Sequence, residues 1–188
     1  MNNKPLNLFV GPSGSGKTTI ANEFEKYGYK QVKSYTTRAP RCQEEDNHIF
    51  ISDEEFDKLE NIIAYTEYSG HRYCATKEQI DDSDIYVIDI DGVNVLLEKY
   101  DNLKRTIHIW YFESNINTRI SRMINRGDAG MTIVGRVLND ESYDWYDKLS
   151  VLIEYHQYFG DGKNVKLHIV NANRPVNEII VDELCFLK

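Results

Sequence analysis

The residue spacing with the clearest chemical meaning lies near the start of the chain. Two glycines five positions apart are followed directly by a lysine and a threonine, in the run Gly11-Pro12-Ser13-Gly14-Ser15-Gly16-Lys17-Thr18. Glycine lets backbone N–H groups turn toward one point without steric cost. In this spacing the lysine reaches the β- and γ-phosphates and the threonine hydroxyl ligates Mg²⁺. The run therefore predicts a phosphate-binding loop for a nucleoside triphosphate, with Lys17 as a catalytic cation.

The segments on either side of this run support the same interpretation. Residues 6–10 (Leu-Asn-Leu-Phe-Val) are typical of a short buried strand, and Ile20, Phe24 and Tyr27 recur at i, i+4 and i+7, as in an amphipathic helix. The N-terminus of such a helix adds partial positive charge where the loop ends. A glycine-rich turn that only caps a helix is the alternative, and the lysine, threonine, strand and helix together disfavour it.

Composition limits the classes of partner. The chain has 188 residues, 41% of them hydrophobic, and a formal net charge of −8. An acidic surface repels nucleic acid and anionic membrane, so neither is expected as a partner. Cys42, Cys74 and Cys185 are odd in number and lack C-x-x-C spacing, which favours reduced thiols. With no apolar run of membrane-spanning length and no cationic-then-hydrophobic leader, we expect a cytoplasmic protein.

Apolar segments alternate with helical ones along the chain. Ser52 and Glu55 fit a capping box that opens a short helix, and a final helix is expected from about Pro175. Further strands are expected at 31–35, 85–90, 107–112 and 165–170. Strands that alternate with helices after a phosphate loop predict an α/β fold with a parallel central sheet between helices, that is, a three-layer sandwich. The segments near 34–75 and 113–140 are the expected excursions from it.

The stretch from Ser114 to Gly127 has helical periodicity. One face carries apolar residues, Ile116, Ile120, Met123 and Ile124, and an adjoining face carries Arg119, Arg122 and Arg126. Arg136 then lies in a second helical stretch. Four arginines in one window of an acidic protein suggest a clamp for a migrating phosphoryl group. A solvated charged flank is the alternative for this helix taken alone.

These segments together resemble the guanylate kinase family, whose members transfer a phosphoryl group from ATP to GMP. Residues 34–41 (Ser-Tyr-Thr-Thr-Arg-Ala-Pro-Arg) resemble its S-x-T-T-R-x-P-R element, and residues 50–56 resemble its F-x-S-x-E-E-F helix entry. Residues 89–91 (Asp-Ile-Asp) are similar to its carboxylate-bearing strand end, and residues 122–127 to its R-L-x-x-R-G lid helix. The resemblance covers about residues 6 to 180, in order and with similar gaps.

The resemblance implies a role for each matching residue. Arg38 and Arg41 would hold the phosphate of the acceptor monophosphate together with Tyr73, and Ser34 and Asp91 would bond its base. The other implied contacts are Glu44 and His48 on the acceptor, Asn171 near the adenine, Asp89 and Thr18 on Mg²⁺, and Arg122, Arg126 and Arg136 on the transferring phosphoryl group. It also implies a single domain with a core of 1–33, 76–112 and 141–188, a monophosphate-binding segment of 34–75 and a lid of 113–140.

Several positions depart from the family pattern. Gln43-Glu44 replaces G-E, His48 stands where a tyrosine is expected, and Tyr73-Cys74-Ala75 replaces Y-G-T. Counting back from Gly70 places Ala64 where the family has a glutamate that reads guanine. An unpaired buried polar edge costs about 1–3 kcal/mol, so Glu67 or Glu44 would have to supply the missing acceptor.

Three functions therefore remain open from the sequence. The first is ATP- and Mg²⁺-dependent transfer to a nucleoside monophosphate, with GMP converted to GDP. The second keeps this chemistry on another phosphorylated acceptor, either another nucleotide or ribose bisphosphate. For either function we expect a monomer or a homodimer. The third is a non-catalytic module that binds phosphoproteins, which the intact Gly16, Lys17 and Thr18 disfavour.

Overall fold

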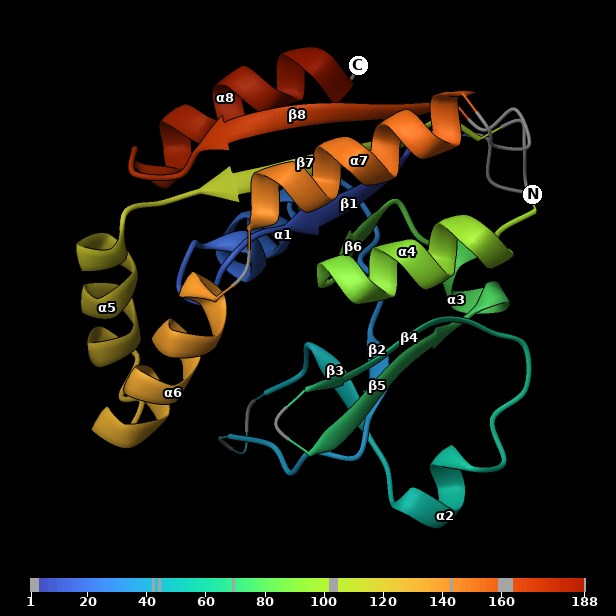
Figure 1. The fold of residues 1–188 in the computed structure, drawn as a ribbon, viewed down its shortest axis with the longest axis horizontal. Coiled ribbons are helices and arrows are strands. Elements are labelled where there is room, and N and C mark those ends of the chain that lie inside the picture. Colours follow the sequence, from blue (N-terminus) through green and yellow to red (C-terminus); the bar gives the residue numbers. More distant parts are fainter. Residues whose placement is uncertain are drawn as a thin grey trace.

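A four-stranded parallel sheet with strand order β6-β1-β7-β8 forms the centre of the protein (Figure 1). The computed structural model describes residues 4–187 except 42, 44, 69, 102–104, 143 and 159–163. The strands are β1 (Leu6–Val10), β6 (Ile85–Val87), β7 (Ile107–Glu113) and β8 (Val165–Asn171). Because all four run parallel, their carboxyl ends meet at one edge, and the loop after β1 opens there.

Helices cover both faces of this sheet. Leu8 and Ile109 pack with Leu96 and Leu149 on the face covered by α4 (Ile90–Lys99) and α7 (Trp145–Tyr158). The opposite face packs against α1 (Lys17–Glu25) and α8 (Val176–Leu187), in a cluster that includes Phe9, Phe24, Phe112 and Ile179. Alternation of side chains along each strand supplies both faces. The α/β prediction of a parallel sheet between helices is confirmed.

A second sheet of order β3-β2-β5-β4 lies below the first in Figure 1. It contains β2 (Ser34–Thr36), β3 (His48–Phe50), β4 (Ile62–Tyr68) and β5 (His71–Thr76), with the short helices α2 (Asp53–Phe56) and α3 (Lys77–Asp81) beside it. Only β2 and β3 run parallel, and the other pairs are antiparallel. Helix α4 contacts β4, so it joins the two sheets.

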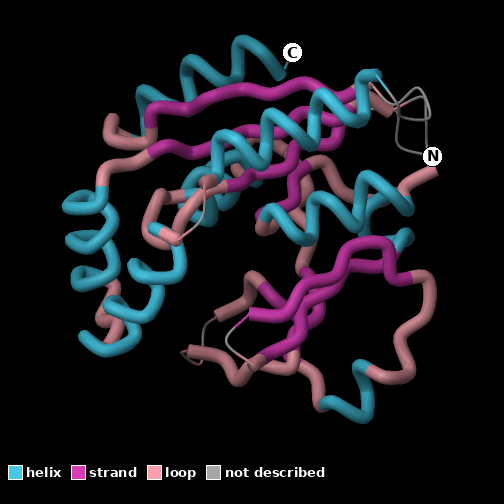
Figure 2. The backbone as a smooth tube through the Cα atoms, in the orientation of Figure 1, coloured by secondary structure: helices cyan, strands magenta, loops and turns pink. Residues whose placement is uncertain are grey.

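Two further helices, α5 (Ile116–Asn125) and α6 (Gly130–Glu141), follow the end of β7 and pack on each other. Figure 2 shows them to one side of the central sheet, across from the second sheet. Asn115 caps α5 through a hydrogen bond from Thr118 N–H of 2.8 Å, and Gly127 follows the helix with a φ of 86°. A residue with positive φ cannot continue the helix, so the chain turns there toward α6.

Two sequence expectations differ from the structure in detail. Residues 31–35 do not form one strand: Gln31 makes an isolated bridge to Ile85 in the central sheet, whereas Ser34–Thr36 belongs to the second sheet. The chain leaves the core here because Ser34 onward pairs with β3 and β5. The strand expected at 85–90 ends at Val87, because the Asp89 side chain accepts Gly92 N–H and caps α4.

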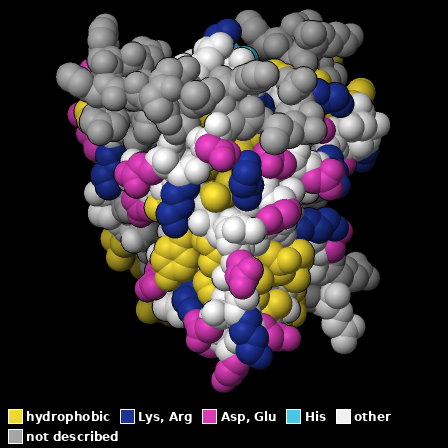
Figure 3. Space-filling view, turned by 90° about the vertical axis from the view of Figure 1, so that its right-hand side faces the viewer, with side chains coloured by type: hydrophobic (Ala, Val, Ile, Leu, Met, Phe, Trp, Pro, Cys, Tyr) yellow, Lys and Arg dark blue, Asp and Glu magenta, His cyan; other side chains and the backbone are white. Residues whose placement is uncertain are grey.

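The surface mixes charges of both signs. On the face drawn in Figure 3, Lys and Arg side chains alternate with Asp and Glu, and hydrophobic side chains gather in the lower half. The basic side chains visible on this face are therefore separated by acidic ones. Among the helices of the described residues, none combines the length and the apolar content that crossing a bilayer requires.

Candidate active site

The glycine-rich loop between β1 and α1 packs tightly against neighbouring backbone. Gly11 has a φ of 145°, and a Cβ there would lie 2.7 Å from the Phe112 carbonyl oxygen. Gly14 has a φ of 78°, and a Cβ there would lie 2.7 Å from the Arg119 carbonyl oxygen. Both the conformation and the contacts therefore require glycine. The loop delivers the chain into α1, whose first residue is Lys17.

The Lys17 ammonium lies across its own loop. Its Nζ donates to the Gly11 carbonyl at 2.7 Å, to the Pro12 carbonyl at 2.9 Å and to Ser15 Oγ at 3.3 Å. Burial lowers the pKa of Lys17 to about 8, and the nearby Asp140 carboxylate opposes this shift. Carbonyl oxygens hold the ammonium where an incoming phosphate would offer stronger, charged acceptors.

Two arginines of α5 donate hydrogen bonds to backbone carbonyls of the glycine-rich loop. Arg119 donates to the Ser13 carbonyl at 3.2 Å, and Arg122 donates to the Ser15 carbonyl at 3.0 Å and the Ala172 carbonyl at 2.8 Å. The apolar face of this helix packs only in part, with Met123 0% exposed, and Arg119 and Arg122 have the loop as their common target. Arg119 is 4% exposed and Ile124 is 59% exposed. The Ser13 carbonyl and two α6 carboxylates accept hydrogen bonds from Arg119, which makes its burial possible.

On the facing side, the loop after β2 holds two arginines around one carboxylate. Arg38 forms a two-pronged ion pair with Glu45, with nitrogen–oxygen distances of 2.7 and 3.2 Å. The Arg41 backbone N–H donates to Glu45 at 2.6 Å, and the Arg38 guanidinium lies 5.4 Å from the centre of the Phe50 ring. A carboxylate held this way occupies the donors that a phosphate would use.

Next to this loop, Ser34, His48 and Tyr73 form one group. Ser34 Oγ lies 2.9 Å from His48 Nδ1, and the His48 and Tyr73 rings meet edge to face with centres 5.7 Å apart. Burial and the positive charge of Arg38 lower the pKa of His48 to about 4. The imidazole is therefore neutral at pH 7, and Tyr73 also interacts electrostatically with Arg38.

Guanidinium groups from two segments distant in sequence act on one another electrostatically. Burial lowers the pKa of Arg41, and the positive charges of Arg136 and Arg38 lower it further. Arg126 and Arg136 both bind the Asp128 carboxylate, at 3.0 Å from Arg126 Nε and 3.2 Å from Arg136 Nη1. Arg41 also acts on Asp128 electrostatically. Cations of the β2–β3 loop and of the α5–α6 segment thus gather around one region, where a polyanion would be attracted.

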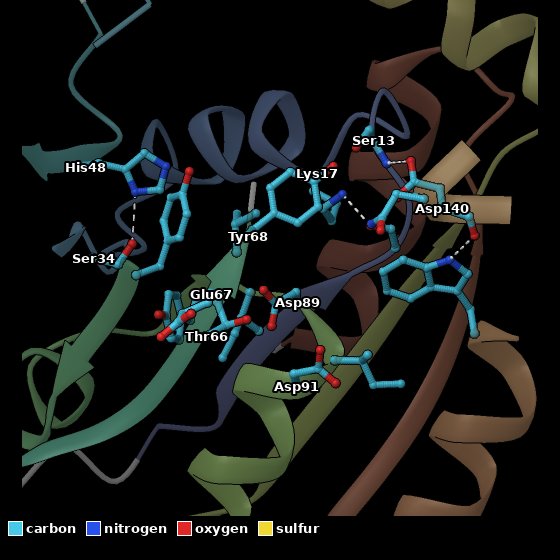
Figure 4. Close-up of a pocket in the computed structure, with 18 of the residues that line it drawn as sticks. Ser13, Lys17, Ser34, His48, Thr66, Glu67, Tyr68, Asp89, Asp91 and Asp140 are labelled. Carbon is cyan, nitrogen blue, oxygen red and sulfur yellow. Dashed lines mark hydrogen bonds between the residues drawn. The ribbon is translucent and has the colours of Figure 1, made fainter. Parts of the chain in front are cut away.

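A cavity of about 530 Å³ lies between these two sides (Figure 4). Figure 4 shows Lys17 and Ser13 on one side of it and Ser34 and His48 on the other, with Asp89 and Asp91 between. Of the candidate residues named from the sequence, the lining contains Gly11, Ser13, Lys17, Ser34, Arg41, His48, Tyr73, Asp89 and Asp91. Residues that are far apart in sequence therefore line one cavity: those of the glycine-rich loop, the group around Ser34 and His48, and the carboxylates Asp89 and Asp91.

Comparison with known proteins gives a fold. No family model and no curated protein matches the sequence. Among solved structures, guanylate kinase from Anaplasma phagocytophilum matches with a TM-score of 0.55 and 16% identity, over 98% of this chain and 84% of that chain. The chain has the fold of guanylate kinase. Deoxyadenosine kinase from M. mycoides, with bound dATP, matches with a TM-score of 0.45 and 17% identity, over 97% of this chain and 98% of that chain.

The other residues that the sequence predicted for the site are not among those that line the cavity. Arg38, Arg126 and Arg136 pair with carboxylates beside the cavity, and Arg122 binds the loop from behind. Asn171 lies at the end of β8, where its Oδ1 accepts the Asn173 N–H at 3.1 Å. Glu44 lies outside the described residues. The remaining loop candidates, Pro12, Gly14, Ser15, Gly16 and Thr18, lie in the loop or at the start of α1.

Sequence reasoning missed several residues that line the cavity: Thr66, Tyr68, Tyr86, Asn139, Asp140 and Trp145. Three of them carried a usable signal. Asp140 follows Arg136 by four positions in one helix, which places both on the same face. Thr66 and Tyr68 are two apart on a strand and so share a face. Ala64, where a base-reading glutamate was expected, is 1% exposed and packed in the core.

The residues expected at a magnesium ion have the right chemistry. Asp89 lines the cavity, and burial raises the pKa of its carboxyl, while one of its oxygens accepts Gly92 N–H at 2.7 Å. Within the described residues, no three His, Cys, Asp or Glu side chains gather as a metal-binding group. Mg²⁺ is commonly held by one or two carboxylates together with substrate phosphates and water. A hydroxyl and one carboxylate fit that mode.

Proposed function

We propose that this protein transfers a phosphoryl group from ATP to a nucleoside monophosphate, with GMP as the first acceptor to test. The observation that carries the proposal is that Lys17 of the phosphate loop and Arg41 of the facing loop line the same cavity. Phosphoryl transfer needs little covalent chemistry from a protein, because positioning and charge neutralisation supply most of the rate. Cations on both sides of one space suit that task.

The proposed reaction assigns the two sides different roles. A phosphate oxygen of the acceptor attacks the γ-phosphorus of ATP, and the bond from that phosphorus to the β-phosphate oxygen breaks to leave ADP. The loop N–H groups and Lys17 hold the donor phosphates, while Arg38, Arg41 and Tyr73 hold the acceptor phosphate. Arg126 and Arg136, with Arg122 behind the loop, neutralise charge that spreads over the moving group. Held by Thr18 and Asp89, Mg²⁺ would supply further neutralisation of the triphosphate.

One observation favours an acceptor other than GMP. Ala64 has no acceptor for the guanine N1–H and N2–H₂ donors and faces the core. Glu67 lines the cavity two residues before Ser69, but its carboxylate accepts the Tyr65 hydroxyl hydrogen bond. Thr66 and Tyr86 also line the cavity, and each carries a hydroxyl group. Another nucleotide, or ribose bisphosphate, is therefore the second candidate.

A panel of acceptors tests the proposal. Purified protein with ATP and Mg²⁺ is given GMP, dGMP, AMP, CMP, UMP or ribose bisphosphate, and the products are separated by ion-exchange chromatography. The expected result is stoichiometric ADP and phosphorylated acceptor for at least one nucleoside monophosphate. Turnover of the sugar phosphate alone would move the function to the second candidate. ATP binding with no transfer to any acceptor would contradict an enzyme.

Replacing Lys17 with alanine provides the matched control for the panel. We expect Lys17→Ala to lower turnover by about 10²–10³-fold, the effect typical of removing one donor that stabilises the transition state. The fold should persist, because burial already opposes the charge of Lys17 in the folded protein. Circular dichroism and thermal unfolding check the fold. Wild-type turnover in this variant would remove Lys17 from the mechanism.

A further inference from the structure

Two acidic residues flank helix α6 (Gly130–Glu141), one just before it and one in its last turn. The carboxylate of each lies among hydrogen-bond donors that could also bind an anion. Asp128 stands two residues before the helix, with a side chain 8% exposed. Asp140 stands in its last turn and is 5% exposed. Buried carboxylates are costly unless donors surround them. The donors around each carboxylate therefore indicate which kind of ligand could replace it.

Asp140 binds the phosphate loop itself. Its Oδ2 accepts the Ser13 N–H at 2.8 Å, and the Arg119 guanidinium lies 3.4 Å from the same oxygen. Ser13 and Asp140 both line the cavity, and Figure 4 shows the bond between them beside Lys17. The carboxylate is also the main charge that opposes loss of the Lys17 proton. Backbone N–H groups of such a loop are donors for phosphate oxygens. One donor of the loop is thus already taken by an anion of the same chain.

Asp128 makes the corresponding contact at the other end. Its two oxygens accept from Arg126 Nε and Nη2, and one of them also accepts from Arg136 Nη1 at 3.2 Å. Arg41, from the facing loop, adds its positive charge. Two planar guanidinium groups around one pair of oxygens is the arrangement that binds a phosphate. Asp128 therefore occupies the guanidinium donors of Arg126 and Arg136, within the electrostatic reach of Arg41.

We propose that Asp128 and Asp140 are internal substitutes for phosphate groups: they occupy donors that nucleotide phosphates would use, and nucleotides must displace them. This inference rests on the proposed function and concerns the regulation of the same site. Binding of the donor triphosphate replaces Asp140 at Ser13 N–H, and a phosphate between the arginines replaces Asp128. Release of Asp140 detaches the end of α6 from the loop, and release of Asp128 frees the Arg136 guanidinium. Arg136, which lies on this helix, is then delivered to the transferring group only when both nucleotides are present.

The affinity of single variants tests the proposal. Calorimetric titration with ATP is compared in the wild type, Asp140→Asn and Asp128→Asn, and titration with inorganic phosphate in the same three proteins. Removing a competing carboxylate should tighten binding, so Asp140→Asn is expected to bind ATP about tenfold more tightly. Asp128→Asn is expected to tighten binding of inorganic phosphate by a similar factor and to change ATP affinity less.

Glu141→Gln is the matched control. Glu141 neighbours Asp140 and also pairs with Arg119, at 2.9 Å, but its carboxylate makes no contact with the loop in any hydrogen bond of the described residues. We expect its ATP affinity to equal that of the wild type. Unchanged or weaker ATP binding by Asp140→Asn would overturn the proposal for that end of α6, as would equal tightening in Glu141→Gln. A wild type that binds no ATP would instead overturn the proposed function.

Fluorescence supplies a second readout of the same step. The Trp145 indole lines the cavity and donates to the Asp140 backbone carbonyl at 3.2 Å, whereas Trp110 is buried in the core. Displacement of Asp140 should change Trp145 emission on ATP binding, and Asp140→Asn without ligand should resemble the ligand-bound wild type. If Asp140→Asn fails to fold, Asp128→Asn with inorganic phosphate decides the proposal. Loss of the emission change in Trp145→Phe confirms the source of the signal, and an unchanged emission in the wild type contradicts displacement.

Discussion

At the scale of single residues, the site is a set of cations held by weaker or internal partners. Lys17 is bound by carbonyl oxygens of its own loop, Arg38 by Glu45, and Arg126 by Asp128. A phosphate offers each of them a charge-assisted hydrogen bond. These side chains are therefore already ordered before a phosphate binds. Binding only exchanges one hydrogen-bond acceptor for another, which keeps the rearrangement of the side chains small.

The ionisation of Lys17 predicts a pH dependence of ATP binding. Burial lowers the pKa of Lys17 to about 8 in the empty protein. Phosphate binds the protonated form, so ATP affinity should stay constant below pH 8 and fall as pH rises through 8, by up to about tenfold per pH unit. Calorimetry between pH 7 and 9.5 measures this. Lys17→Arg is the control, because arginine stays charged throughout this range, and its affinity should not fall. Parallel loss of affinity in both proteins would assign the titration to another group.

At the scale of secondary-structure elements, the glycine-rich loop after β1 and α5 are packed as one unit. The Gly14 position approaches the Arg119 backbone, while Arg119 and Arg122 donate to loop carbonyls. A movement of α5 would therefore move the loop, and a movement of the loop would move α5. This coupling makes the loop conformation depend on residues more than a hundred positions away in sequence.

Gly14→Ala tests this packing. The new Cβ would lie 2.7 Å from the Arg119 carbonyl oxygen, at a φ of 78°. Clash and backbone strain together are expected to lower the free energy of unfolding by about 2–4 kcal/mol and to weaken ATP binding. Gly28→Ala is the matched control, since Gly28 has a φ of 85° with no heavy atom within 4 Å of the added Cβ. It should lose only about 1 kcal/mol, from strain. Equal losses in urea unfolding of the two variants would show that the contact with α5 contributes nothing.

The elements also show how far the sequence alone leads. The loop at 11–18 follows a strand and opens a helix as predicted, because glycine spacing and apolar periodicity are local signals. The capping box of Ser52 and Glu55 is confirmed for the same reason. The direction of Arg119 was not predictable, because an α6 carboxylate and a loop carbonyl make its burial favourable. Asp140 shares a helix face with Arg136, but its contact with the loop was not predictable, because its partner there is the backbone N–H of Ser13.

At the scale of the whole molecule, an acidic protein places several cations at or near one cavity. The net charge is −8, yet Lys17, Arg41, Arg126 and Arg136 surround or line one cavity. These residues come from three segments that the fold brings together: the loop after β1, the loop after β2, and the α5–α6 region. Local cations in an otherwise repelling surface favour small polyanions that enter the cavity over nucleic acids that need an extended surface.

This arrangement predicts that donor and acceptor bind at the same time with their phosphates facing each other. A single molecule that spans both sites tests this most directly: adenosine joined through five phosphates to the nucleoside of the acceptor that turns over fastest. Because the second half binds intramolecularly, calorimetry should give an affinity about 10²–10⁴-fold above that of ATP. Arg41→Ala should remove most of that gain and leave ATP binding nearly unchanged. An affinity no higher than that of ATP would contradict two facing phosphate sites in one cavity.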